Sequence, residues 1–565
     1  MRWPELEAEA GGGAAAALPA RSIAALWGAF TLLALGVERA ALRGPFVSDD
    51  IGYLVSNPWG HELSLANLRA IFDPYGPVAS WTANWAPVHM LAHALEWQAF
   101  GPSTLGYHVV NVVLHALVSA LLVPFLTSAG LPLVAALGGG LFFLLHPANV
   151  EAVAWITQLK TLLATVFALL ALLAHPRRPA LGAALFGLAL LSKAQAVFAL
   201  PVLAWGELEA RWRRGEALRL RWLAVWAGIF LLYSAPQLAA FEGLGDPGLP
   251  LHPDPVVAAR TVVAIGARYV AMAATSWGVA PFQDPPRALS PVDPWFVAGL
   301  VVGALALLRI AWTLRRGRPE AAFWIWAVAA YAPVSQLIPF LYPIADRYLY
   351  DVLPGLVGVA LLGGRDAASR LAPRVPPHLH PTLRRVGLAC ACVALVLFAG
   401  RSARLAGLWR SDLALLAESA RAYPAGLSAD LLRARRAAQA RDVEGVVAAL
   451  RAAEDRGYDQ YMAVASDPVY APVRNDPRFR AVLSELAGRW LEAVAPRGYS
   501  LPHELRTVAD AHAVRGEWRE AEATLERALE KAGPDERPSL ERDLERARRA
   551  RAALEREDGG DGPGR

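Results

Sequence analysis

The stretch FVSDDIGYLVSNP, residues 46–58, follows the first long apolar run of the chain, Ile23–Ala41. It places two adjacent carboxylates, Asp49 and Asp50, where the chain leaves a segment long enough to cross a bilayer. Paired acids at the mouth of an apolar bundle suit a transferase that needs a general base or a charge clamp. The alternative interpretation is structural, with a solvated turn or with Asp50 as a helix N-cap.

Composition predicts a membrane protein with a soluble part. The chain has 565 residues, 55% of them hydrophobic, and its mean hydropathy is +0.32. Apolar runs fill 22–400, whereas 401–565 is dense in arginine and glutamate. We therefore predict an all-α fold with an N-terminal tail (1–21), a polytopic membrane domain (22–400), a soluble helical domain (401–550) and a disordered tail (551–565).

The distribution of charge predicts how the chain crosses the membrane. Arginine supplies most of the net charge of +5 and is typical of cytoplasmic loops, so we predict no nucleic-acid partner. Four loops are basic: 175–178, 207–221, 315–318 and 365–385. They fall on one side only if 258–280 does not cross, and this stretch is therefore predicted to be an interfacial or re-entrant helix pair. About eleven spans follow, with the N-terminus cytoplasmic and the C-terminal domain extracytoplasmic, in a multi-pass protein of the bacterial inner membrane.

This topology predicts one site on the outer face. Lys193 points to that face, and four further stretches share it: Asp49–Asp50, His146–Lys160, Phe241–Asp293 and Ala345–Asp351. The only cysteines, Cys390 and Cys392, lie in an apolar run at a spacing that makes a disulfide or a metal pair unexpected.

The soluble part carries a repeat signal. Residues 501–534 read LPHELRTVADAHAVRGEWREAEATLERALEKAGP and fit a 34-residue helix-turn-helix repeat. The small and apolar positions of that repeat are Ala509, Gly516, Ala521, Leu525 and Ala528. A degenerate copy is predicted over 427–457, and Asp467 and Asp476, each followed by proline, are predicted to start helices.

Five motifs in order carry a family resemblance. They are FVSDDIGYLVSNP (46–58), GYHVVNVVLHAL (106–117), LLHPANVEAVAWI (144–156), LLSKAQAVFALP (190–201) and PIADRYLYDVLP (343–354). The chain resembles GT-C type polytopic glycosyltransferases, most closely the transmembrane and tetratricopeptide-repeat O-mannosyltransferases and their bacterial relatives. The resemblance implies transfer of a sugar from a polyprenyl-phosphate donor to a protein or glycan acceptor on the extracytoplasmic side of the bilayer.

The resemblance also implies roles for particular residues. Asp49 or Asp50 matches the first-loop acid and is the general-base candidate, while the other binds a divalent metal or orients its neighbour. Arg347 and Lys193 are candidates for the donor phosphate.

The remaining candidates are predicted to orient other groups. Asp346 would hold Arg347, and His146 and Glu151 would orient substrate. The structural alternatives are an Asp346–Arg347 bridge, a snorkelling Lys193, and Glu151 as a helix cap. No cofactor is predicted beyond that divalent metal, for which His89, His93 and Glu96 share another helix face.

Three departures from the family pattern favour a second interpretation. The sequence NWAPVHM (84–90) lacks the arginine of an Arg-Pro-Leu element, TQLKT (157–161) leaves only Lys160 of an Arg-Lys-Asp element, and Ala194 replaces a glutamate. A catalytically weak or inactive membrane scaffold that binds proteins through its helical repeats is therefore the alternative. A transporter is less favoured, because the chain shows no paired broken helices in two corresponding halves.

Overall fold

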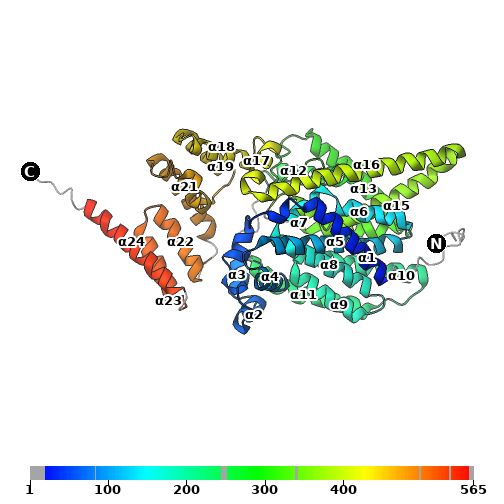
Figure 1. The fold of residues 1–565 in the computed structure, drawn as a ribbon, viewed down its shortest axis with the longest axis horizontal. Coiled ribbons are helices and arrows are strands. Elements are labelled where there is room, and N and C mark those ends of the chain that lie inside the picture. The colour runs from blue at the N-terminus through cyan, green and yellow to red at the C-terminus, as the bar shows by residue number, and fades with distance from the viewer. Residues whose placement is uncertain are drawn as a thin grey trace, which may run out of the picture. The chain divides into compact units, whose positions relative to one another are not determined.

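Helices joined by loops make up the part of the chain described by the computed structural model, as the many alanine and leucine residues favour (Figure 1). The described residues are 19–82, 84–242, 251–337, 342–495, 498–499, 501–533 and 536–558. Most of the predicted tail 1–21, the last seven residues of the predicted tail 551–565, and Pro534 lie outside them.

Contacts within the chain define two units. The first comprises Met1–Ala240, Gly248–Gln283 and Arg287–Leu415, and the second comprises Phe241–Pro247, Asp284–Pro286 and Leu416–Arg565. The sequence places the end of the membrane domain at residue 400, but helix α16 (His380–Ala406) continues past that point.

The first unit is built from long helices and short connecting ones. Its helices before α12 are α1 (Ala20–Glu38), α2 (Leu65–Phe72), α3 (Pro77–Thr82), α4 (Pro87–Phe100), α5 (Thr104–Ser128), α6 (Leu133–Leu144), α7 (Val150–Ala154), α8 (Leu159–Ala174), α9 (Pro179–Ser192), α10 (Ala199–Arg214) and α11 (Leu220–Glu242). They are followed by α12 (Pro255–Thr275), α13 (Pro294–Arg315), α14 (Glu320–Tyr331), α15 (Leu353–Leu371) and α16.

Apolar helices make this chain an integral membrane protein. In the described part of the chain, seven helices are long and apolar enough to span a bilayer, or eight if the bent pair Leu133–Leu144 and Pro147–Ala154 forms one span. Two shorter apolar helices, Pro179–Ser192 and Glu320–Val334, account for part of the difference from the eleven spans expected. The predicted helix pair at 258–280 is wrong, because α12 is one unbroken helix of 21 residues.

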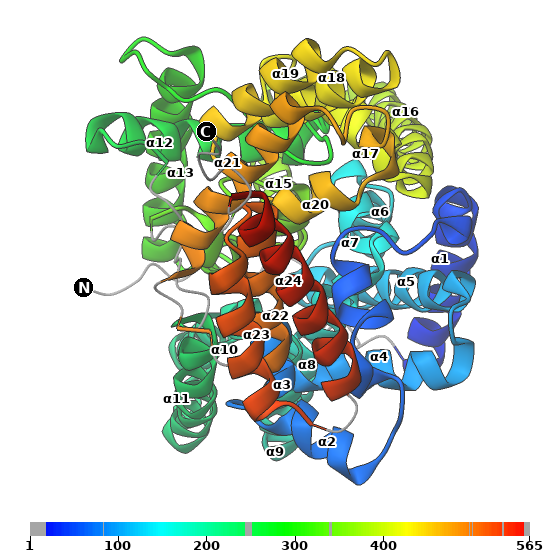
Figure 2. The ribbon, with the colours of Figure 1, turned by 90° about the vertical axis from the view of Figure 1, so that its left-hand side faces the viewer.

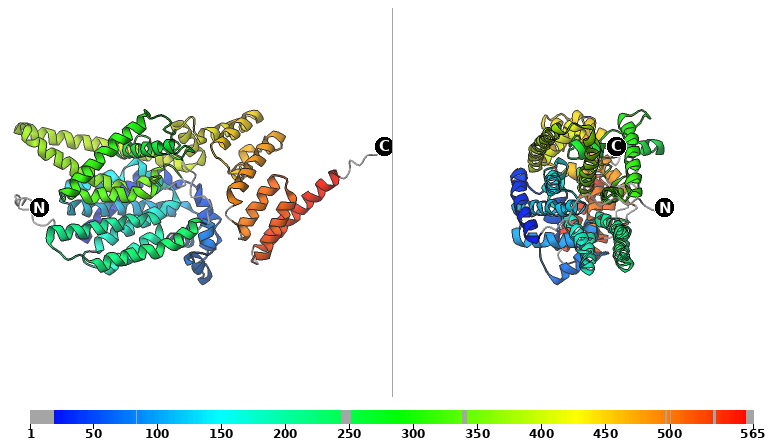
Figure 3. Two further views of the ribbon diagram at one scale, coloured as in Figure 1. Left: turned by 180° about the vertical axis from the view of Figure 1, so that it is seen from behind. Right: turned by 90° about the vertical axis from the view of Figure 1, so that its right-hand side faces the viewer.

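Helix α5 lies at the centre of the first unit and packs against α1, α6 and α8 (Figure 1). Helices α9 and α11 lie next to each other (Figure 3). Phe186 of α9 stacks on Trp226 of α11, with ring centres 4.3 Å apart. Glycines allow close packing between α14 and α15: a Cβ on Gly355 would lie 2.6 Å from the Ala327 nitrogen. Small residues at such crossings let helix backbones approach closely, which is a common way of packing membrane helices.

The second unit consists of consecutive helical hairpins (Figure 2). Its helices are α17 (Asp412–Ala422, which begins in the first unit), α18 (Leu427–Gln439), α19 (Val443–Asp455), α20 (Tyr461–Ser466), α21 (Pro477–Val494), α22 (Pro502–Val514), α23 (Trp518–Lys531) and α24 (Arg537–Asp558).

Both predicted repeat hairpins are present, as α18–α19 and α22–α23. Gly516 turns the chain between α22 and α23 with φ +78°, a conformation that glycine adopts without strain. Ala521 and Ala528 are fully buried. The backbone N–H groups of Val469 and Arg478 donate to Asp467 and Asp476, which confirms the predicted helix starts.

Candidate functional site

Asp49 and Asp50 occupy opposite environments on the loop between α1 and α2. Asp49 is exposed, whereas Asp50 is 1% exposed. The backbone N–H groups of Val47 and Thr157 donate to the two carboxylate oxygens of Asp50 at 3.0 and 2.9 Å. Asp50 precedes a helical turn, Ile51–Val55, but its side chain makes no capping hydrogen bond, so the predicted N-cap alternative is wrong. The buried carboxylate instead joins the first loop to the segment before α8.

The surroundings of Asp50 also affect its protonation. Burial raises the pKa of the Asp50 carboxyl to about 7, while the two backbone N–H donors act in the opposite direction. Ser48, which precedes the acids, has φ +52°, an uncommon conformation for a residue with a Cβ. Backbone held in such a conformation costs free energy and is frequent at functional sites.

Several predicted stretches meet at the start of α8 and at the turn before it, Ile156–Gln158. Thr157 binds Asp50, and three residues later the Lys160 ammonium lies 4.8 Å from the centre of the Tyr53 ring. The ammonium of Lys193, which follows α9, donates to the hydroxyl of Thr161 at 2.8 Å. Lys193 also interacts electrostatically with Asp351. The structure therefore brings Lys193 to the segment that Asp50 binds.

Arg347 forms an ion pair with Glu151. The Arg347 backbone N–H donates to the other Glu151 oxygen at 2.8 Å. The Glu151 carboxylate therefore binds both the backbone and the guanidinium of Arg347, and does not cap α7. The guanidinium carbon lies 4.8 Å from the ring centre of Tyr342, 5.0 Å from that of Tyr348 and 5.2 Å from that of Trp155. Aromatic faces attract a cation at this range, which fixes the guanidinium further.

Asp346 does not hold Arg347 as the sequence predicted. Its carboxylate is buried and accepts a hydrogen bond from the Gln283 amide at 2.5 Å, because adjacent residues of the turn 346–349 point in different directions. Burial and the neighbouring charge of Glu151 raise the pKa of Asp346 well above its usual range. Asp346 therefore joins the site to the long loop after α12.

His146 is buried and has a partner on each ring nitrogen. Its Nε2 donates to the Ala273 carbonyl at 3.1 Å, and its Nδ1 accepts from the Ala148 N–H at 3.2 Å. These contacts fix the turn before Glu151 against the end of α12. His146 thus acts on the site through the backbone that carries Glu151.

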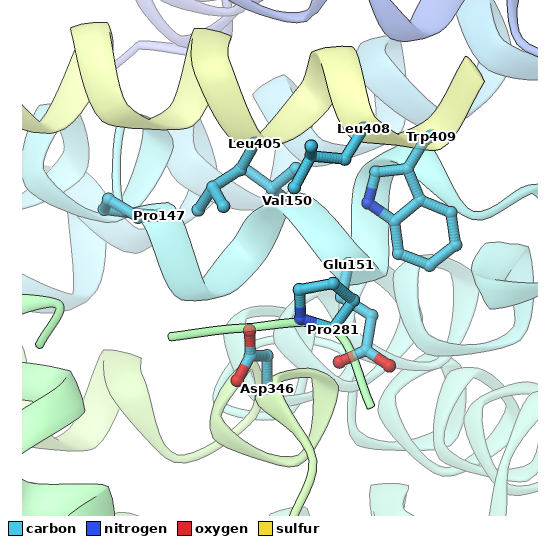
Figure 4. Close-up of a pocket in the computed structure, with 8 residues that line it drawn as sticks. All are labelled: Pro147, Val150, Glu151, Pro281, Asp346, Leu405, Leu408 and Trp409. Atoms are coloured by element: carbon cyan, nitrogen blue, oxygen red, sulfur yellow. The ribbon is translucent and has the colours of Figure 1, made fainter. Parts of the chain in front are cut away.

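A shallow pocket of about 10 Å³, room for about one water molecule, is lined in part by Glu151 (Figure 4). Leu405, Leu408 and Trp409 form one side of it, while Glu151, Asp346 and Pro281 lie opposite (Figure 4). Both carboxylates are engaged by protein donors, through Arg347 and Gln283 respectively. The pocket therefore leaves one side of the Glu151 carboxylate next to an apolar wall.

The described residues contain no group of three or more His, Cys, Asp or Glu side chains arranged to hold a metal ion. His93 Nδ1 and Glu96 Oε2 lie 2.7 Å apart, and His89 packs edge-on against His93 with ring centres 4.4 Å apart. Cys390 and Cys392 are exposed and unpaired.

Sequence reasoning located the loops of this site but missed several of their contacts. Gln283 carried no signal, since an amide in a long loop has no distinguishing pattern. Thr157 acts through its backbone N–H, which any residue except proline supplies. Lys160 was visible as the charge retained in TQLKT, and its position next to Tyr53 was not.

Comparison with known proteins finds three relatives with a common description. Protein O-mannosyl-transferase F38B6.6 of Caenorhabditis elegans is 28% identical over 234 residues, which cover 37% of this chain and 32% of that protein. Protein O-mannosyl-transferase Tmtc1 of Drosophila melanogaster is 39% identical over 95 residues, covering 17% of this chain and 11% of the fly protein. Protein O-mannosyl-transferase TMTC1 of Mus musculus is 34% identical over 146 residues, covering 24% of this chain and 15% of the mouse protein.

The matched region thus spans about a third or less of the length of these curated relatives. No family model and no solved structure matches the chain. The relatives nevertheless confirm the resemblance that the ordered motifs predicted: over part of its length, this chain is related to the transmembrane and tetratricopeptide-repeat protein O-mannosyltransferases.

Proposed function

We propose that this protein is an integral-membrane glycosyltransferase. It moves a sugar from a polyprenyl-phosphate donor to a hydroxyl of a protein or glycan acceptor on the extracytoplasmic face. The observation that carries the proposal is the meeting of separate loops around the start of α8. Asp50 binds Thr157 in the turn just before α8, Lys193 binds Thr161 in its first turn, and Arg347 is held by Glu151. The protein O-mannosyl-transferase relatives support the same class of reaction.

Asp49 is the general base in this proposal. It is the exposed member of the pair, and its charge interacts with Lys160 and Tyr53. A carboxylate in that position can take the proton of the acceptor hydroxyl as its oxygen attacks the anomeric carbon. Asp50 is a positioning residue, since both of its oxygens accept backbone N–H groups.

The leaving group is the lipid phosphate, released as the bond to the anomeric carbon breaks. Arg347 and Lys193 supply positive charge near it, and a guanidinium can bind two phosphate oxygens at once. Asp346, His146 and Glu151 keep these loops in place through Gln283, Ala273 and Arg347. The reaction in this form has no step that requires a divalent metal.

The decisive experiment compares Asp49→Asn with Asp50→Asn in the full-length protein reconstituted with a polyprenyl-phosphate sugar. We expect Asp49→Asn to lower kcat by about 10²–10⁴-fold, the usual contribution of a general base, without changing the apparent Tm. Asp50→Asn should lower both kcat and the apparent Tm, because the amide nitrogen would face one of the two backbone N–H donors that Asp50 accepts. An Asp49→Asn protein that retains full transfer activity would falsify the proposed role of Asp49.

A membrane scaffold remains the second candidate, and the helical hairpins α18–α19 and α22–α23 favour it. Hairpins of this kind present an extended surface for protein partners. The scaffold predicts partner capture that is equal in the wild type and in Asp49→Asn, together with no transfer by either protein.

A further inference from the structure

The cations of the site differ in what they already bind. Arg347 is paired with Glu151 through its guanidinium and its backbone N–H. The Lys193 ammonium donates to Thr161. Lys160 is different, because among the described residues it forms neither an ion pair nor a hydrogen bond, and its ammonium rests over the Tyr53 ring at 4.8 Å.

Lys160 lies close to the proposed base. It follows Thr157, whose N–H binds Asp50, by less than one helical turn, and the charges of Asp49 and Asp50 act on it. Its side chain is half-buried, so water has limited access to the ammonium. An ammonium held near apolar surroundings without a carboxylate partner is costly, and an incoming anion would lower that cost.

The use of lysine in the chain points to the same place. Only three of the 55 basic residues are lysines, Lys160, Lys193 and Lys531, and the first two meet at the first turn of α8. Lysine is a compact point charge on a flexible stem, whereas arginine is a rigid fork. A phosphate that must be bound and then released with its lipid suits the flexible charge.

We infer that Lys160 makes the direct contact with the phosphate of the polyprenyl-phosphate donor, with Tyr53 holding its side chain when the site is empty. Arg347 and Lys193 add positive potential around that contact. The inference rests on the proposed function and adds to it the residue that recognises the donor.

Binding without turnover tests this assignment. The full chain in phosphatidylcholine nanodiscs is titrated with farnesyl phosphate, with farnesol, and with inorganic phosphate. We expect the wild type to prefer farnesyl phosphate, and Lys160→Ala to weaken that binding roughly tenfold while leaving farnesol unchanged. Lys160→Arg should retain most of the binding, and the matched control Lys531→Ala, at the end of α23, should bind as the wild type does.

Two results would overturn the inference. One is that Lys160→Ala binds farnesyl phosphate as tightly as the wild type does. Equally, a loss of farnesol affinity as large as the loss of farnesyl phosphate affinity would indicate a purely structural residue. The other is that inorganic phosphate binds the wild type as tightly as farnesyl phosphate does and loses affinity in Lys160→Ala. That result would identify a site for free phosphate and not for a lipid.

Its failure is distinguishable from failure of the proposed function. If the wild type transfers sugar and Lys160→Ala leaves the donor KM unchanged, only the assignment of Lys160 fails. If farnesyl phosphate binding depends on Lys160 while the wild type transfers no sugar, the proposed glycosyltransferase function is wrong and the assignment of Lys160 to the phosphate is retained.

Discussion

Asp49 and Asp50 are neighbours in the chain with opposite surroundings, and the sequence could not assign their roles. Both are aspartates in one loop, so any distinction depends on side-chain direction. Direction is set by Thr157, which lies 107 residues further along the chain from Asp50. The loop itself was predictable as a candidate site, because two adjacent acids directly after an apolar span suit either a catalytic site or a solvated turn.

The raised pKa of Asp50 predicts a pH-dependent stability. The folded state holds the proton up to about pH 7, whereas an unfolded aspartate loses it near 3.8. Between these values the folded state binds more protons at Asp50. The contribution of this group to stability is therefore greatest below about pH 4, falls as pH rises, and levels off above 7. We expect the apparent Tm in detergent to decline over this window, and Asp50→Asn to flatten the decline. An identical slope in both proteins would assign the pH dependence to other groups.

Replacing Arg347 should change the KM for the lipid donor more than the KM for the acceptor. Arg347→Ala removes a guanidinium enclosed by aromatic rings and leaves Glu151 buried without its ion-pair partner. We expect the KM for the lipid donor to rise about tenfold, because the positive potential around the donor phosphate falls. The control Arg370→Ala removes an exposed guanidinium that pairs with Asp366 on α15, and it should leave the donor KM unchanged. A change confined to the acceptor KM would contradict the assignment.

Among the helices, α12 shows why segments are easier to predict than their behaviour in the membrane. The sequence predicted that 258–280 does not cross, because only then do the basic loops fall on one side. The stretch also holds two arginines, Arg260 and Arg268. In the structure Arg260 donates to the Leu289 carbonyl at 2.8 Å, and Arg268 lies 4.6 Å from the centre of the Trp295 ring. Both partners belong to the segment 289–295, so the helix can remain unbroken. Periodicity reveals a helix, but not the tertiary contacts that its charges find.

Close packing of α14 against α15 predicts unequal effects of two glycine substitutions on the same helix. A Cβ on Gly355 would lie 2.6 Å from the Ala327 nitrogen and 2.8 Å from the Phe323 carbonyl oxygen, which forces the helices apart. Gly364 has nothing within 4 Å. We expect Gly355→Ala to lower stability by about 1–3 kcal/mol, the usual cost of overpacking, and Gly364→Ala to be neutral or stabilising. Equal apparent Tm values for both variants in one detergent would refute the close packing.

For the whole molecule, the number of spans fixes the sides on which the chain's ends lie. Among the described residues seven helices could span the bilayer, an odd number like the eleven spans expected from sequence, and counting the bent pair as a span makes eight. The two shorter apolar helices add two crossings together and leave the parity unchanged. Sequence predicted a helical fold with a membrane part correctly, but apolar composition carried no sign of the 48° bend between Leu133–Leu144 and Pro147–Ala154.

A reporter fused after Arg565 tests the proposed topology. We expect it to report an extracytoplasmic location, as an odd number of spans with a cytoplasmic N-terminus requires. A matched fusion within the basic loop 207–221 should report the cytoplasm. A cytoplasmic signal from the Arg565 fusion would favour an even number of spans and would separate the second unit from the proposed side of the reaction.

The bond between Asp50 and Thr157 has a consequence for the timing of catalysis. It fastens the loop that carries Asp49 to the start of a buried helix, so this loop has little freedom to swing over a bound substrate. Many transferases wait for a lid to shut before chemistry begins. Here the acid would already stand in place when the acceptor arrives, and the slow events of the cycle would be the entry and departure of lipid.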